Sequence, residues 1–239
     1  MQALAPRSWR SYQAAWRSFQ SFVSQAGLQF FPLHPKVVEL YVVVLARRVR
    51  FSTIKAYLTA LKFFNTYYGF DSSSCFSPQL RYILRGVRRT QASTLPPRPA
   101  RIPITTAHLQ LLFQFVSHMF SPMDALCYRA AFTLAFFGLL RVSEFTCPSP
   151  HSFDPSIHLS VHDIHFSVSP HIAFIRIKQS KTDPFRQGCV IRVARTSHAL
   201  CPYNALATYM HCHLRRSGPL FSFVDGSFLT RAHIQSVLR

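Results

Sequence analysis

The amino-acid sequence predicts a mainly helical protein with a small antiparallel sheet in its second half. Three observations support this class. Apolar residues recur at helical spacing through the first 91 residues, a proline-rich stretch follows, and three short alternating or β-branched runs lie between residues 159 and 193. With 49% apolar residues, a chain of 239 residues can bury one large core or two small ones.

Four helices are expected in the N-terminal part of the chain. The first begins near Ser8 and ends near Gly27. Pro35 opens the second helix, and Ser52 is positioned to cap the third. The fourth spans Pro78–Arg89 and carries four arginines opposite an apolar face. Together they predict a helical domain of residues 1–91.

The charge balance indicates a polyanionic partner. The chain has 27 Lys and Arg against 8 Asp and Glu, a net charge of +19. Residues 1–91 hold 13 of the basic residues but only Glu39 and Asp71 as acids, which leaves +11 for this segment. Nucleic acid is favoured over acidic lipid as this partner, because the sequence has no apolar run of 18 residues that could enter a membrane. An intracellular protein is expected, because the sequence has no signal peptide. The residues expected to contact DNA are Arg17, Lys55, Lys62, Arg85, Arg88, Arg89 and Arg186.

Residues 92–104 are rich in proline and lack glycine, which predicts a semi-rigid linker to a second domain of residues 105–239. In that domain, Thr105 or Thr106 caps one helix, and another runs from about Pro122 to Arg141. Three strands and two further helices are then expected. Their ranges are Leu159–Phe166, His171–Lys178 and Cys189–Val193 for the strands, and residues 202–213 and 229–238 for the helices.

The segment Phe132–Phe145 combines an apolar helix with two opposite charges. Its first half is apolar on every side, which is typical of a buried helix, and it places Arg141 and Glu144 three residues apart. A buried guanidinium needs a partner, so an ion pair between these two residues is expected. On these residues alone, a structural ion pair and a functional site fit equally well.

The six cysteines never form a C-x-x-C pair, and in an intracellular protein this spacing favours free thiols. Histidines cluster at residues 158–165 and 211–213, but neither cluster has matched Cys or His partners at zinc-finger spacing. Neither a metal nor a cofactor is therefore expected.

Two motifs resemble those of a known family. GLLRVSE at residues 138–144 is similar to the first box, G-L-R-x-S-E, of the tyrosine recombinases, the phage integrase family. QSKT at residues 179–182 resembles the lysine signature on that family's β-hairpin, and SKTDPFRQG looks most like recombinases of DIRS-like and crypton-like mobile elements. The basic helical segment resembles the family's SAM-like core-binding domain, and residues 105–239 then resemble part of its α+β catalytic domain.

The resemblance implies DNA recombination and integration without a metal, in which a tyrosine hydroxyl attacks a DNA phosphate and forms a covalent phosphotyrosine intermediate. It implies that Arg141 stabilises the charge of the transition state, with Glu144 as its supporting partner. It also implies that Lys181 protonates the leaving 5′ oxygen, and Lys178 is the alternative for this role.

The sequence departs from the family pattern after the predicted sheet. The H-x-x-R box and the nucleophilic tyrosine are missing where the family has them, and the string His213–Arg216 is interpreted as a chance match. The catalytic domain is therefore expected to be incomplete and to expose apolar surface. The expected function is binding of double-stranded DNA in the nucleus without cleavage, with self-association on DNA as a further expectation.

Two other functions stay open. An active site-specific recombinase is expected if the chain is a fragment or if another chain supplies the missing groups, and the reading frame would then continue into an H-x-x-R box and a tyrosine. A basic RNA-binding or protein-interaction module is the other alternative. Comparing duplex DNA with RNA at matched salt distinguishes it.

Overall fold

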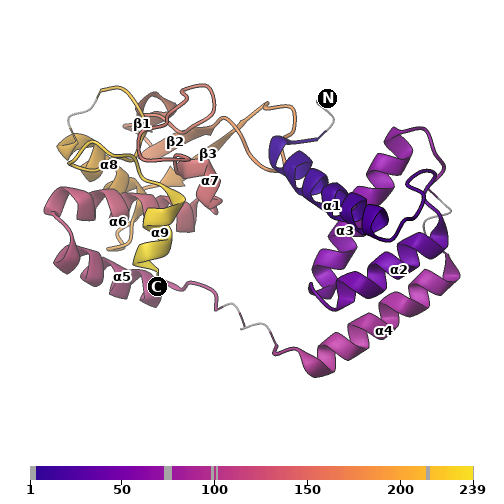
Figure 1. Cartoon of the computed structure of the whole chain (residues 1–239). Helices are drawn as coiled ribbons and strands as arrows, with labels where there is room; N and C mark the ends of the chain where they lie inside the picture. Colours follow the sequence, from indigo (N-terminus) through magenta and orange to yellow (C-terminus); the bar gives the residue numbers. More distant parts are fainter. Residues whose placement is uncertain (1–3, 73–76, 98–99, 101, 214–215, 239) are drawn as a thin grey trace. The chain divides into compact units, whose positions relative to one another are not determined.

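The computed structural model of the chain describes residues 4–72, 77–97, 100, 102–213 and 216–238. It is mainly helical with a three-stranded antiparallel sheet, which confirms the predicted combination of helices with a small antiparallel sheet. The chain divides into two compact units, Met1–Arg101 and Ile102–Arg239, and each has its own core (Figure 1). Cys75, part of the expected linker and residues 214 and 215 of the H-x-x-R string lie outside the described residues.

The described residues of the first unit form four α-helices, α1 (Pro6–Gln25), α2 (Pro35–Ala46), α3 (Phe51–Tyr67) and α4 (Pro78–Thr94). Proline begins three of them, since its fixed φ suits the first helical turn and its missing N–H has no partner there. Helix α1 packs against α3, and α2 packs against α4. Helix α4 extends past residue 92, where the linker was expected to begin, because the first residue that disfavours a helix is Leu95, which precedes Pro96.

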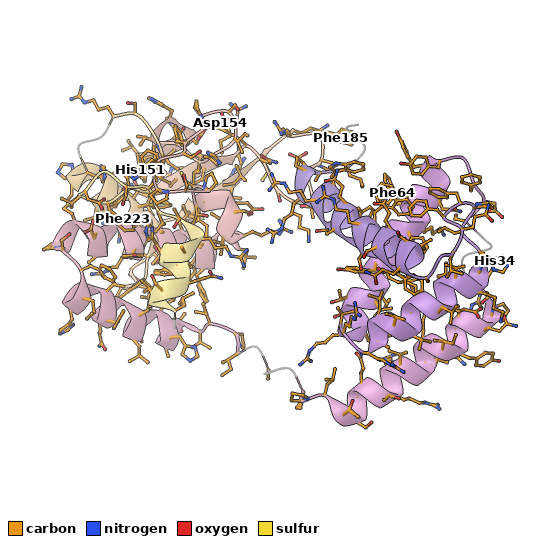
Figure 2. The ribbon with its side chains drawn as sticks, in the orientation of Figure 1. His34, Phe64, His151, Asp154, Phe185 and Phe223 are labelled. Atoms are coloured by element: carbon orange, nitrogen blue, oxygen red, sulfur yellow. The ribbon has the colours of Figure 1, made fainter. Side chains whose placement is uncertain are left out.

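Aromatic side chains fill the core of the first unit. The buried rings of Trp16 and Phe64 lie 4.7 Å apart between centroids, and Phe19 is fully buried beside them (Figure 2 labels Phe64). Trp16, Phe19 and Val23, which recur at helical spacing, therefore lie on the buried face of α1.

Gln91 joins three helices of the first unit. Its side-chain oxygen accepts a hydrogen bond from the backbone N–H of Phe51 (2.6 Å), and its amide group donates to the carbonyl oxygens of Ala46 (3.0 Å) and Val49 (2.8 Å). The prediction that Ser52 caps α3 was wrong, because the helix begins one residue earlier and Arg50 occupies the capping position without a side-chain hydrogen bond. The acceptor for the backbone N–H of Phe51 comes instead from Gln91 of α4, which is far from α3 in the sequence.

The second unit combines helices with the sheet. Its elements are α5 (Thr106–Met119), α6 (Pro122–Phe137), α7 (Val142–Phe145), a 3₁₀ turn (Val161–Asp163), β1 (Ile164–Ser167), β2 (Ile172–Ile177), β3 (Cys189–Ala194), α8 (Pro202–Cys212) and α9 (Arg231–Val237). Helix α6 packs against α8 and α5, and α5 is capped by Thr105, one of the two threonines predicted for this position. The strands are antiparallel in the order β1-β2-β3, and Ala173, Ile175 and Ile177 of β2 are buried in the same core as α6.

The first strand is shorter than the predicted range Leu159–Phe166. Ser160 forms a bridge with Pro219, and the backbone N–H of Leu220 donates to the carbonyl of Leu159. Residues 159 and 160 therefore pair with residues 219 and 220 and not with the sheet. Residues 161–163 form the 3₁₀ turn that precedes β1. Within the described ranges, no helix is long and apolar enough to cross a bilayer.

Candidate functional site

Arg141 lies directly before a short helix, α7, as its N-cap residue. We predicted that it lies at the end of a long buried helix, and this was wrong, because α6 ends at Phe137. A Cβ atom on Gly138 would lie 2.6 Å from the carbonyl oxygen of Leu134 and 2.9 Å from Ile191, and Leu139 adopts a positive φ of 53°. The helix therefore stops before Gly138, and the chain changes direction at Leu139. As a result, Arg141 is not buried with α6, and 49% of its side chain is exposed.

Arg141, Glu144 and Ser180 form one hydrogen-bonded group. Nη1 of Arg141 donates to Oε1 of Glu144 (2.9 Å) and to Oγ of Ser180 (2.8 Å), which confirms the expected ion pair. The Ser180 hydroxyl donates to the same Oε1 (2.7 Å), and Oε2 accepts from the backbone N–H of Arg141 (2.9 Å). The turn between β2 and β3 is thereby attached to the start of α7.

Glu144 is the anionic centre of this group, and only 7% of its side chain is exposed. Burial alone raises the pKa of its carboxyl group, but the hydrogen bonds from Arg141 and Ser180 outweigh burial, so the pKa lies below the usual value. Glu144 is therefore ionised at neutral pH and fixes the guanidinium of Arg141.

The two lysines of the hairpin have different surroundings. Lys178 is largely buried, pairs with Asp163, and donates to the carbonyl oxygens of Pro155 (2.7 Å) and His158 (3.2 Å). Lys181 is exposed, and its side chain forms no hydrogen bond or ion pair with any residue that the structure describes. A paired, buried ammonium is a structural group, whereas an exposed ammonium can reach a ligand. Of the two lysines, only Lys181 has an exposed ammonium group without a partner among the described residues.

A cavity of about 330 Å³ opens beside Arg141, and residues of the β2–β3 turn, including Ser180, Thr182 and Asp183, line its other side. Arg186 follows in the same loop and is exposed. The structure thus brings Arg141 and Glu144 together with the turn that carries Lys181 and Arg186.

The other expected DNA contacts lie on the surface of the first unit. Arg17 is on α1, Lys55 and Lys62 are on α3, and Arg85, Arg88 and Arg89 are on α4; all six are exposed. Lys55 and Lys62 share one exposed face, because they are seven residues apart on a helix whose opposite face is buried. These residues and Arg141 belong to different units.

Most carboxylates are used inside the fold. Among the described residues, these Asp and Glu side chains accept hydrogen bonds from nearby residues, mainly in helix caps and turns: Glu39, Asp124, Glu144, Asp154, Asp163, Asp183 and Asp225. Glu39, for example, is buried and accepts from Ser77, the cap of α4. The ion pairs Lys36–Glu39, Arg141–Glu144 and Lys178–Asp163 involve few of the basic residues in the parts of the chain described. The basic surface is therefore largely uncompensated.

One histidine of each cluster has a structural partner. His158 accepts from the backbone N–H of Asp154 (2.9 Å), and His213 of the H-x-x-R string lies 3.0 Å from the Ser222 hydroxyl and packs edge-on against Tyr209. The Tyr209 hydroxyl is hydrogen-bonded to the backbone of Ser222, and the ring is buried, as expected of a core residue.

Among the described residues, no group of three or more His, Cys, Asp and Glu could hold a metal. Their cysteines carry free thiols.

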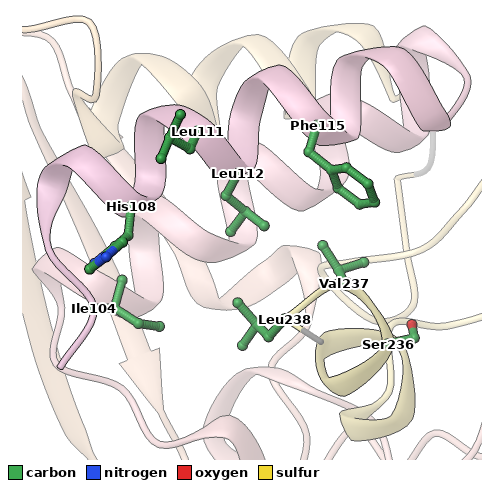
Figure 3. Close-up of a pocket in the computed structure, with 8 residues that line it drawn as sticks. All are labelled: Ile104, His108, Leu111, Leu112, Phe115, Ser236, Val237 and Leu238. Carbon is green, nitrogen blue, oxygen red and sulfur yellow. The ribbon is translucent and has the colours of Figure 1, made fainter. Parts of the chain in front are cut away.

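A second cavity, of about 370 Å³, is apolar (Figure 3). Leu111, Leu112 and Phe115 of α5 line one side, and Val237 and Leu238 line the other. Leu111 is 62% exposed and Phe115 is 45% exposed. The second unit therefore presents an apolar groove to solvent.

No family model matches the sequence, and no curated protein matches it. Sequence reasoning placed Arg141, Glu144 and Lys181 in the site but missed the role of Ser180. The available signal was its position inside the QSKT motif, directly before Lys181.

Proposed function

We propose that this chain binds double-stranded DNA through the phosphate backbone. The observation that supports it best is the distribution of charge. The chain carries 27 Lys and Arg against 8 Asp and Glu, and most of these acids are held in hydrogen bonds within the fold. Such a surface attracts a polyanion over a wide area and releases its counterions on binding.

We further propose that the second unit holds one phosphate at Arg141. The guanidinium is oriented by Glu144 and Ser180 and is half exposed, so it can donate to phosphate oxygens without first being ordered. Lys181 adds a second cation from the adjoining turn. This pairing is the basis for proposing descent from the tyrosine recombinases, with the first unit as a core-binding domain.

Cleavage is not part of the proposed activity. The segments that form the site, residues 138–145 and 177–191, contain no tyrosine, so they supply phosphate-binding groups and a possible general acid but no tyrosine nucleophile. A nuclear location and self-association on DNA follow from the proposed partner and belong to the proposal.

The test is binding of the whole chain to duplex DNA across a salt series. Each phosphate contact contributes about −0.9 to the slope of log affinity against log salt concentration. Replacing Arg85, Arg88 and Arg89 by alanine should reduce the magnitude of this slope by about 2 to 3, if each contacts one phosphate. Replacing Arg141 and Lys181 together should reduce it by about 1 to 2.

The matched control removes two exposed arginines from the second unit, Arg195→Ala and Arg231→Ala. It changes the net charge as much as the Arg141 and Lys181 pair does. Equal losses in both pairs would contradict a phosphate site at Arg141. Absence of binding at low salt would contradict the DNA function, and tighter binding to duplex RNA at the same salt would favour the RNA module.

A further inference from the structure

Phe185 is an exposed aromatic residue between two cations. Its side chain is 84% exposed, and it lies in the loop that joins β2 to β3, where Figure 2 labels it. Lys181 precedes it in the same loop, and Arg186 follows it directly. Exposure of an aromatic ring of this size to water is unfavourable, and a ligand that covered the ring would remove this cost.

The loop around Phe185 is held in a fixed shape. The carboxylate of Asp183 accepts a hydrogen bond from the backbone N–H of Gly188 (2.7 Å), and the backbone N–H of Arg186 donates to the carbonyl of Asp183 (3.4 Å). Gly188 has a φ of +71°, and a Cβ atom there would lie 2.7 Å from the carbonyl oxygen of Ile177. Arg186 has a φ of 54°, which non-glycine residues rarely adopt. The ring is thus displayed by a constrained turn.

The same turn borders the Arg141 site. Thr182, Asp183 and Gly188 line the cavity beside Arg141, and Ser180 is hydrogen-bonded to its guanidinium (2.8 Å). A DNA phosphate at Arg141 would bring the neighbouring bases close to the loop. Apolar side chains can enter between base steps, and aromatic rings stack on bases whatever their sequence.

We propose that Phe185 inserts into the base stack of duplex DNA next to the phosphate held by Arg141, with Lys181 and Arg186 contacting the flanking backbone. The ligand class is a duplex with a locally unstacked base step. This inference rests on the proposed DNA binding. It adds a residue that contacts the bases, whereas the phosphate contacts involve only the DNA backbone.

The test uses short duplexes that carry 2-aminopurine at several positions, because the fluorescence of this base rises when it is unstacked. The whole chain should increase the fluorescence on binding. Phe185→Ala should abolish the increase and lower the affinity about 10-fold, with the salt slope unchanged. Phe185→Trp should retain both the affinity and the increase, because indole also stacks. Asp183→Asn, which keeps every cation but weakens the turn, should give a smaller increase.

Val168→Ala is the matched control, since Val168 is 82% exposed in the other hairpin turn of the same sheet. It should behave as the unmodified chain. Binding with no rise in fluorescence, or equal behaviour of Phe185→Ala and the unmodified chain, would overturn the insertion and leave DNA binding in place. Absence of binding by the unmodified chain would overturn both proposals.

Discussion

The hydroxyl group of Ser180 donates a hydrogen bond of 2.7 Å to Oε1 of Glu144, which lies 36 positions earlier in the sequence. This contact joins the two motifs that the sequence singles out, because Glu144 belongs to GLLRVSE and Ser180 to QSKT. Both residues also bind Nη1 of Arg141. The Ser180 hydroxyl therefore helps to fix the turn that carries Lys181 relative to Arg141.

Removing that hydroxyl should destabilise the second unit. Ser180→Ala leaves Glu144 with one hydrogen bond fewer in a largely buried position, and we expect a loss of about 1–3 kcal/mol in the free energy of unfolding. Urea denaturation measures it. Ser197→Ala, an exposed serine in a loop of the same unit, is the control and should change the free energy by less than about 0.5 kcal/mol. Equal effects of the two substitutions would contradict the role of Ser180.

The lowered pKa of Glu144 predicts a pH-dependent contribution to stability. Hydrogen bonds from Arg141 and Ser180 outweigh the opposing effect of burial, so the folded-state pKa lies below the usual value of 4.5. The stabilisation is therefore complete above about pH 4.5 and is lost as the pH falls through the lowered pKa. Unfolding free energies from about pH 7 to about pH 3 should show Glu144→Gln converging with the unmodified chain at acid pH. A difference that stays constant with pH would exclude this linkage.

Replacing Gly188, in the turn between β2 and β3, should destabilise the second unit. Gly188→Ala adds a Cβ atom 2.7 Å from the carbonyl oxygen of Ile177 at a positive φ, and we expect a loss of about 1–3 kcal/mol. Gly86→Ala is the contrasting control, because Gly86 lies in α4 with open space around it. That substitution should stabilise the chain by about 0.5–1 kcal/mol. Urea denaturation of both variants checks the opposite signs.

The helices could be predicted from the sequence because their signals are local. Apolar spacing located the buried face of α1, and the prolines that begin α2 and α4 mark the first helical residues. The sheet could also be placed, since its strands are short β-branched runs separated by turn residues.

The parts that sequence reasoning missed depend on contacts between distant residues. The break after α6 requires a positive φ at Leu139, a residue type that gives no sign of it. The start of the first predicted strand pairs instead with residues near 219, about 60 positions later. The link between Ser180 and Glu144 appears only once the hairpin is folded against α7.

The apolar groove of the second unit should bind a dye that fluoresces on apolar surfaces. Leu111 and Phe115 are partly exposed in it, so the double substitution Leu111→Gln and Phe115→Gln should reduce the fluorescence at least about two-fold with little change in thermal stability. Leu139→Gln is the control, because Leu139 is 89% exposed and does not line the groove. A native chain that leaves the dye dark would contradict an accessible groove.

Gln91 should contribute more to the stability of the first unit than an ordinary surface glutamine does. Its side chain forms hydrogen bonds with three backbone groups, one in α2, one in the α2–α3 turn and one in α3. Gln91→Ala removes the acceptor for Phe51 and the donor for Ala46 and Val49, and we expect a loss of about 2–3 kcal/mol.

Gln91→Glu separates the two halves of this role. It keeps an acceptor for the N–H of Phe51 but has no donor for the two carbonyl groups, and its charge repels them, so we expect a loss at least as large as that of alanine. Gln79→Ala, at an exposed position near the start of the same helix, controls for helix propensity. Thermal and urea unfolding would measure all three variants. A glutamate variant as stable as the unmodified chain would show that the acceptor alone matters and that the bonds to Ala46 and Val49 contribute little.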